Sequence, residues 1–201
     1  MFIFNRKKFF EAYRAQFGTL TQSLVDALEF LLGQFEKDAR FGTTSVDRRQ
    51  LAYCLATFKL ETAHTMLPID EFGSNARFER LYGTGTRLGR RLGNTQPGDG
   101  PRFHGRGYVQ LTGRANYANA ARLTGKPLTD NPALVKDSAV AYEIAINGMI
   151  HGTFTGRRLN QFINANKTDF VNARKIINGL DHAPMIAGVA RHFSEILFAA
   201  I

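Results

Sequence analysis

The fold is decided by residues 51–71, which read LAYCLATFKLETAHTMLPIDE and predict a buried helix that leads to a pair of carboxylates. Apolar residues recur in it at helical spacing, and Glu61 falls on the same face. Apolar surroundings favour the protonated form of a carboxyl group, which a general acid needs. We expect Pro68 to stop the helix. An unbroken helix would place Glu61 and Glu71 about 15 Å apart, so only a broken helix can bring both carboxylates to one substrate. The alternative is an edge Glu61 paired with Lys59 or an arginine, followed by a solvated loop.

The length and composition of the chain indicate one domain. With 201 residues, of which 44% are hydrophobic, we expect a single catalytic domain over residues 1–201 and no separate binding module. The first residues carry their charges after the apolar ones, so they do not predict a secretory signal. Cys54 is the single cysteine, and its place on the apolar helix face predicts a core thiol.

The net charge of +9 is concentrated in residues 77–114, where eight arginines stand against Glu79 and Asp99. Such a field favours an anionic partner, which is a nucleic acid, a membrane surface or a cell-wall polymer, unless it serves only solubility. Aromatic residues interleave with the basic ones in residues 102–117, so a nucleic-acid-binding module is the competing class of function. A gel shift at moderate salt would separate the two classes. The five histidines show no ligand spacing, so we expect no metal and no other cofactor.

The periodicity of the sequence predicts a mainly α protein with at most a small β element. Further helices are expected over residues 6–17, 19–35, 139–150, 168–177 and 184–201. Residues 73–105 are rich in glycine, arginine, asparagine and proline, which predicts a long functional loop. Residues 108–111 are the main candidate for a short strand.

A second group of candidate functional residues lies in residues 103–117, which read FHGRGYVQLTGRANY. This segment is dense in side chains that bind sugars or order water. Amide, hydroxyl and aromatic groups come from Gln110, Thr112, Asn116, Tyr108 and Tyr117. Because Gln110 and Thr112 are two residues apart, we expect them on one side of an extended segment.

Residues 105–117 read GRG-x-x-QLT-x-x-x-NY, which resembles the signature of glycoside hydrolase family 19, a family of chitinases and many phage endolysins. Glu61 and Thr62 resemble its HET motif, and Glu71 lies close to the distance at which bacterial and phage members keep their second acid. Residues 176–179 match its I-N-G element.

The resemblance implies a two-lobed, lysozyme-like fold with a central cleft and an inverting mechanism, in which the two carboxyl groups are about 6.5–9.5 Å apart. Glu61 would be the general acid, Glu71 the general base, and Thr112 would help to hold the attacking water. Glu79 is an alternative base, because another branch of the family places that carboxylate further downstream. The implied substrate-binding residues are Gln110, Asn116 and Asn178. The aromatic ring of Tyr108 is expected, from its residue type, to add a face on which a sugar can stack.

Two departures from the family pattern concern the residues around the acid. Leu60 stands where a histidine usually precedes it, and Ala63 and His64 replace two glycines that often follow. These changes alter the wall of the expected cleft without removing the acid. The chain also lacks the tryptophans and the disulfide framework that are common in plant chitinases.

A disulfide-free hydrolase of this size, without a signal or a binding module, is more typical of a phage or prophage endolysin than of a secreted chitinase. The expected substrate is peptidoglycan, cut between N-acetylmuramic acid and N-acetylglucosamine, and chitin is the alternative. We expect a monomer without a nucleic-acid partner, made in the host cytoplasm and released to the periplasmic wall through a holin-type membrane lesion. A cleft that binds glycan without cleaving it is a third alternative.

Overall fold

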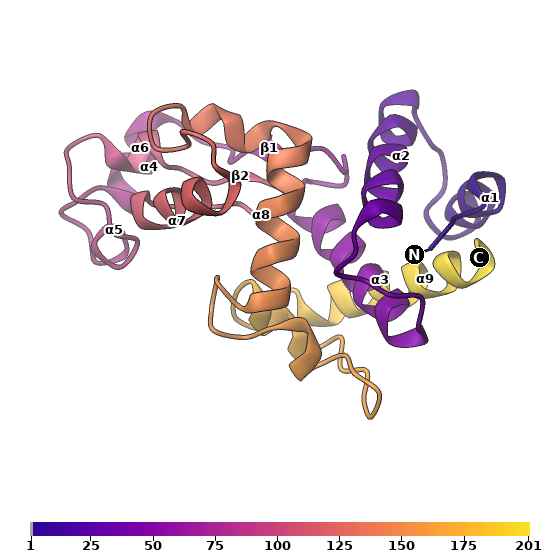
Figure 1. Cartoon of the computed structure of the whole chain (residues 1–201). Helices are drawn as coiled ribbons and strands as arrows, with labels where there is room; N and C mark the ends of the chain where they lie inside the picture. Colours follow the sequence, from indigo (N-terminus) through magenta and orange to yellow (C-terminus); the bar gives the residue numbers. More distant parts are fainter. Residues whose placement is uncertain (1) are drawn as a thin grey trace. The chain divides into compact units, whose positions relative to one another are not determined.

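The computed structural model describes residues 2–201 and confirms a mainly α protein (Figure 1). The α-helices are α1 (Arg6–Phe17), α2 (Gln22–Lys37), α3 (Ser45–Glu61), α4 (Asn75–Tyr82), α5 (Arg87–Arg91), α6 (Asp99–Arg102), α7 (Arg114–Thr124), α8 (Ser138–His151) and α9 (Ala183–Ala199). Three 3₁₀ segments are η1 (Pro132–Lys136), η2 (Leu159–Gln161) and η3 (Asn172–Ile176). The strands β1 (Ile69–Asp70) and β2 (Arg106–Gly107) pair antiparallel.

The chain folds as two compact units. The first unit is the chain up to Met66 together with Ile146–Ile201, and the second unit is Leu67–Ala145. The N-terminal part of α8 belongs to the second unit and its C-terminal part to the first. A single catalytic domain over residues 1–201 stays a prediction, of which Met1 lies outside the described residues.

The core of the first unit is built on α3. Thr44 and Asp47 form a capping box at its start, in which each side chain accepts a hydrogen bond from the other residue's backbone. From Leu51 to Lys59 every residue is buried, so α3 is covered on all sides and not on one face alone. The helix α9 packs along α3 and also contacts α1. Cys54 is fully buried in this core, as predicted, and burial raises the pKa of its thiol.

The end of α3 differs from the prediction, because the helix stops at Glu61 and not at Pro68. Ala63, His64 and Met66 follow with φ of 50°, 68° and 58°, in the left-handed region that residues other than glycine seldom adopt. The Thr62 hydroxyl holds this break, since it donates to the carbonyl oxygen of Phe58 at 2.7 Å and accepts from the Met66 N–H at 3.0 Å. Glu61 is therefore the last residue of the helix.

The second unit corrects the prediction of one long loop over residues 73–105, since α4, α5 and α6 lie within it. Gly89 explains how α5 folds back on α4. A Cβ atom there would lie 2.1 Å from the carbonyl oxygen of Gly83, so only glycine allows this contact. Asn94 then ties the segment down, because its amide donates to the Tyr82 carbonyl oxygen and accepts from the Arg114 N–H, both at 2.7 Å.

Two expected elements are shorter than predicted or absent. Residues 108–111 form no strand, because the chain turns tightly there, with Gly107 at φ 85° and Gln110 at φ 53°. Arg106 and Leu111 close this turn with two backbone hydrogen bonds, of 3.2 and 2.8 Å. Residues 168–177, expected as a helix, contain only η3.

In the described part of the chain, none of the helices combines the length and the apolar character needed to cross a membrane.

Candidate active site

Glu71 is held in one orientation by two neighbouring segments of the second unit. It directly follows β1, and its N–H donates to the carbonyl oxygen of Gly105 at 2.8 Å. Its carboxylate accepts the N–H of Gly105 at 3.1 Å and the hydroxyl of Tyr82 at 2.9 Å. The short sheet therefore sets the backbone of Glu71, and α4 and Gly105 set its side chain.

Tyr82 is a functional neighbour that sequence reasoning missed. Burial, together with the hydrogen bond to Glu71 and the charge of that carboxylate, raises the pKa of Tyr82 to about 12. The hydroxyl thus stays a neutral donor at neutral pH. No sequence signal marked this residue, because it lies in the stretch that was expected to be a loop.

Asp70 fixes the sheet on which Glu71 depends. Its carboxylate contacts Lys136 Nζ at 2.5 Å, Arg106 Nε at 2.9 Å and His104 Nε2 at 3.2 Å. Although burial acts to raise it, the hydrogen bonds from Lys136 and His104 and the nearby positive charges lower the pKa of Asp70. Asp70 and Arg106 are also paired in the sheet. These two residues therefore join β1 to β2 both through the backbone and through their side chains.

Gln110, Thr112 and Asn116 form a connected group beside Glu71. The Thr112 hydroxyl donates to the carbonyl oxygen of Gln110 at 2.9 Å, and the Asn116 amide donates to the carbonyl oxygen of Thr112 at 2.7 Å. A Cβ atom on Gly105 would lie 2.9 Å from Gln110 Oε1 and 3.1 Å from Glu71 Oε2, so this glycine separates the two side chains. The structure thus brings four of the predicted site residues together in one unit. We call them, with Gly105, the Glu71 cluster.

The turn that presents this cluster is strained at Gln110. A left-handed glutamine costs about 1–3 kcal/mol, and such residues occur preferentially at functional sites. The positive φ also corrects the prediction that Gln110 and Thr112 share one side of an extended segment. Because the Thr112 hydrogen is engaged with the Gln110 carbonyl, its oxygen presents lone pairs as an acceptor.

Glu79, also in the second unit, has other neighbours than Glu71. It is exposed on α4, and its carboxylate oxygens lie against Gly83 and Gly100, where added Cβ atoms would come within 2.6 and 2.9 Å of them. On the same helix it is Tyr82 that reaches Glu71.

The ring of Tyr108 contradicts its predicted role as a stacking face. Its side chain is only 1% exposed, and Tyr117 and Phe103 in the same segment are fully buried. The arginines of this segment also serve the fold, since Arg106 bonds Asp70 and the Tyr117 hydroxyl, and Arg114 bonds Asp99. Residues 102–117 therefore do not present the interleaved rings and cations that motivated the nucleic-acid alternative.

Glu61 lies in the first unit and has a charged partner where apolar surroundings were predicted. Its Oε1 is 2.5 Å from Nη1 of Arg174, whose side chain is only 5% exposed. Arg174 also donates from Nε to the carbonyl oxygen of Asp181 at 3.2 Å and lies 3.4 Å from the Asp181 carboxylate. The structure thus shows the alternative in which Glu61 pairs with an arginine. Arg174 bridges two carboxylates that are far apart in the sequence.

Lys59, the other partner considered for Glu61, is used elsewhere in the first unit. Its ammonium donates to the Tyr13 hydroxyl at 2.7 Å and lies 4.6 Å from the centre of the Phe17 ring. Burial lowers the pKa of Lys59. This lysine belongs to the packing of α1 on α3.

Asn178 lies four residues after Arg174, the partner of Glu61, along the chain. It is exposed, and its N–H donates to the carbonyl oxygen of Arg174 at 3.1 Å. Sequence reasoning missed Arg174, although a signal was present: the arginine stands four residues before Asn178, in the segment that was expected to be a helix. We call Glu61, Arg174, Asn178 and Asp181 the Glu61 group.

The candidate residues are therefore assembled as two sets, the Glu61 group in the first unit and the Glu71 cluster in the second. Within residues 2–201, no three His, Cys, Asp or Glu side chains are grouped so that they could hold a metal ion. Two carboxylates can act as a general acid and a general base. The hydroxyl and amide groups around one of them can bind a polar substrate.

The chain is similar in sequence to known proteins. The model of glycoside hydrolase family 19, described as chitinase class I, matches residues 26–153. Acidic endochitinase Q of Nicotiana tabacum is 31% identical over 110 residues, which cover 53% of this chain and 38% of that protein. The acidic 27 kDa endochitinase of Solanum lycopersicum is 47% identical over 57 residues, which cover 28% of this chain and 22% of that protein. The chain thus spans well under half the length of these relatives.

Solved structures show the same fold. Chitinase C from Streptomyces griseus HUT6037 superposes with a TM-score of 0.63 at 20% identity, over 96% of this chain and 76% of that chain. A bacterial family 19 chitinase superposes with a TM-score of 0.64 at 21% identity, over 98% of this chain and 95% of that chain. With the family model matched over more than half of its residues, the chain belongs to glycoside hydrolase family 19, for which an inverting mechanism is characteristic.

Proposed function

We propose that this protein hydrolyses the glycosidic bonds of bacterial peptidoglycan between N-acetylmuramic acid and N-acetylglucosamine. The observation that carries the proposal is the Glu71 cluster, in which a positioned carboxylate lies beside amide and hydroxyl groups suited to a sugar and a water. Membership of family 19 supports the reaction type. The protein acts as an endolysin in this proposal, as a monomer that reaches the wall after a holin-type lesion of the inner membrane.

In the proposed mechanism, Glu61 is the general acid and protonates the glycosidic oxygen. Arg174 positions its carboxyl group through the 2.5 Å contact and is itself held by Asp181. Glu71 is the general base and takes a proton from a water that attacks the anomeric carbon from the opposite face of the sugar, which inverts its configuration. Tyr82 and Gly105 hold the base, and the acceptor oxygen of Thr112 helps to orient the water.

The side chains available to the substrate are polar. Gln110 and Asn116 in the second unit and Asn178 in the first are partly or fully exposed, and their amides match the hydroxyl and acetamido groups of an amino sugar. The buried Tyr108 takes no part in binding. Gly105 keeps the space between Glu71 and Gln110 open.

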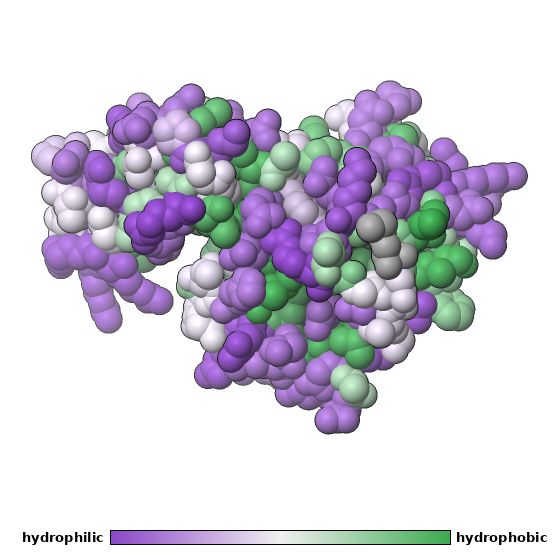
Figure 2. Space-filling model, in the orientation of Figure 1, coloured by the Kyte–Doolittle hydropathy of each residue, from purple (hydrophilic) through white to green (hydrophobic). Residues whose placement is uncertain are grey.

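The preference for peptidoglycan over chitin is supported by the basic surface of α4 and α5. Arg77, Arg80, Arg87 and Arg91 are exposed, and within the described residues none of them forms an ion pair. The face of the molecule in Figure 2 is mostly hydrophilic, with apolar residues in separate patches. A positive surface attracts the carboxylates and phosphates of a bacterial wall and gains nothing from neutral chitin. Chitin is the second candidate, because the similar proteins are named chitinases.

Overlays of purified peptidoglycan and of colloidal chitin test the substrate. We expect radial clearing of the peptidoglycan overlay and none of the chitin overlay at equal protein concentration. Clearing of chitin alone would make the protein a chitinase. Mass spectrometry of the released reducing ends then identifies the bond, and N-acetylmuramic acid is the expected reducing sugar.

Replacing Gly105 with alanine tests the cluster without replacing a catalytic residue. The new Cβ would lie 2.9 Å from Gln110 Oε1 and 3.3 Å from Glu71 Cβ, so both side chains have to shift. We expect kcat on peptidoglycan to fall by about 10-fold to 100-fold, because small displacements of catalytic groups are costly. The matched control is Gly85→Ala, where nothing lies within 4 Å of the added atom. Equal rates for the two variants would count against the proposed placement of the base.

A further inference from the structure

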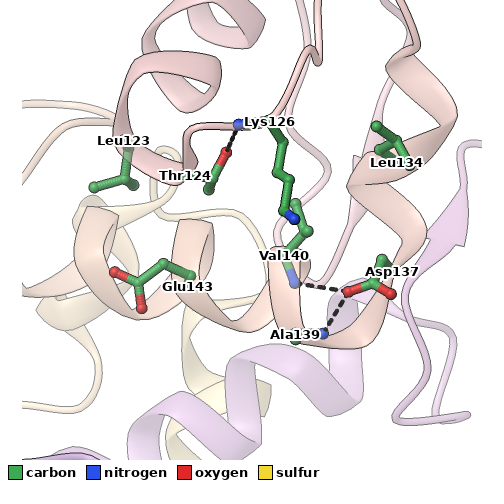
Figure 3. Close-up of a pocket in the computed structure, with 8 residues that line it drawn as sticks. All are labelled: Leu123, Thr124, Lys126, Leu134, Asp137, Ala139, Val140 and Glu143. Atoms are coloured by element: carbon green, nitrogen blue, oxygen red, sulfur yellow. Dashed lines mark hydrogen bonds between the residues drawn. The ribbon is translucent and has the colours of Figure 1, made fainter.

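A cavity of about 470 Å³ lies in the second unit, away from the residues assigned above (Figure 3). It is open to solvent and is lined by the C-terminal end of α7, the following turn, η1 and the first turns of α8. All its lining residues fall within Leu67–Ala145. The residues that matter here are Leu123, Lys126, Leu134, Asp137, Val140 and Glu143.

The pocket combines an apolar wall with both signs of charge. Leu123, Leu134 and Val140 supply the apolar wall, and Leu123 is 40% exposed. Lys126 extends across the pocket toward Val140, and its ammonium makes no hydrogen bond or ion pair within residues 2–201. A carboxylate is thus the complementary group for the centre of the pocket.

The two acidic residues lie on opposite sides of Lys126 in Figure 3. Asp137 caps α8, since its Oδ1 accepts the N–H groups of Ala139 and Val140 at 3.0 and 3.1 Å. This cap fixes the carboxylate at the rim of the pocket. Glu143 lines the pocket from the next turn of α8. Together they suit an ammonium group on a ligand whose carboxylate meets Lys126.

The helix α7 connects this pocket with the Glu71 cluster. Asn116 and Leu123 are seven residues apart, so they lie on the same face of α7, separated by about 10 Å along its axis. A peptide of three extended residues also spans about 10 Å. A peptide attached to a sugar at Asn116 would therefore reach the pocket by running along this face.

We propose that this pocket binds the stem peptide of peptidoglycan through an aliphatic diamino acid whose side chain ends in an ammonium and a carboxylate. In this proposal the carboxylate meets Lys126, the ammonium lies near Asp137 or Glu143, and the methylene chain packs on Leu123 and Val140. Such a residue, meso-diaminopimelate, is the third residue of the stem in Gram-negative walls. The proposal rests on the proposed function and deepens it, because chitin carries no peptide.

Calorimetric titration with the free tripeptide L-Ala-γ-D-Glu-meso-diaminopimelate tests the pocket without hydrolysis. We expect the parent to bind it and Lys126→Gln to bind it roughly five-fold more weakly, as for the loss of one partly exposed ion pair. The matched control is Lys7→Gln, an exposed lysine on α1 whose loss should leave the affinity unchanged. No binding by the parent, or equal affinities for the parent and Lys126→Gln, would overturn the proposal.

A kinetic readout separates this inference from the proposed function. For Lys126→Gln we expect the KM on intact peptidoglycan to rise several-fold relative to the KM on strands stripped of their peptides by an amidase, with kcat little changed. A KM ratio that stays at the parental value would contradict a peptide site. If the protein cleaves only chitin, the proposed function fails, and the tripeptide titration still decides whether the pocket binds the peptide.

Discussion

Replacing Glu61 with glutamine is expected to lower the rate of peptidoglycan hydrolysis at least about 100-fold, the usual contribution of a general acid. Glutamine keeps the size of the side chain and an oxygen for Arg174, but it has no proton to donate. The free energy of unfolding should fall by about 1–3 kcal/mol, because Arg174 loses one charged partner and keeps Asp181. Initial rates on purified wall and a urea unfolding curve measure the two effects.

The control for this variant is Glu11→Gln, at an exposed position on α1 in the same unit. It should keep both the parental rate and the parental stability. A Glu61→Gln protein that is less stable but still clears wall at the parental rate would reduce the contact between Glu61 and Arg174 to a structural ion pair. The assignment of the acid would then be wrong.

Replacing Glu71 with glutamine should have an effect of similar size, about 100-fold or more on kcat, because the attacking water loses its base. Glu79→Gln is the matched comparison, since it makes the same chemical change on α4, outside the Glu71 cluster. We expect Glu79→Gln to stay within about two-fold of the parent, as for an exposed surface substitution. Rates at saturating substrate compare the two variants, and circular dichroism checks that both are folded.

The reverse ranking, with Glu79→Gln inactive and Glu71→Gln active, would move the base to Glu79. The contacts of Tyr82 and Gly105 with Glu71 would then serve the fold and not catalysis. Loss of activity in both variants with intact folding would mean that a carboxylate exposed on α4 also contacts the substrate.

The features that could be predicted from the sequence are those that depend on local pattern or residue type. The apolar run through Cys54 and Leu55 predicted a buried helix, and α3 is buried at every residue from Leu51 to Lys59. The amide and hydroxyl residues of the 105–117 segment predicted a polar group suited to sugars. The structure gathers Gln110, Thr112 and Asn116 beside Glu71.

The end of α3 could not be predicted, because the residues that break it are not the types that mark a left-handed turn. Glycine and asparagine adopt positive φ at low cost, whereas Ala63, His64 and Met66 do so only when the surrounding fold holds them. Pro68 offered a conventional stop signal, and the helix had already ended seven residues earlier.

The partners of Glu61 and Glu71 could not be predicted from the sequence pattern either. Arg174 is 113 residues from Glu61 along the chain, and Gly105 is 34 residues from Glu71. Such contacts depend on the tertiary fold, which hydrophobic periodicity does not encode. The burial of Tyr108 has the same origin, since an aromatic residue in a tight turn can face either the core or the solvent.

The mechanism is tested most directly by proton NMR of the reducing end at the moment of its release from a β-linked glycan. Inversion by Glu61 and Glu71 predicts that the α-anomer appears first and then relaxes toward the equilibrium mixture by mutarotation. If the β-anomer appears first, the water does not attack from the face opposite the leaving group, and the proposed roles of both carboxylates are contradicted.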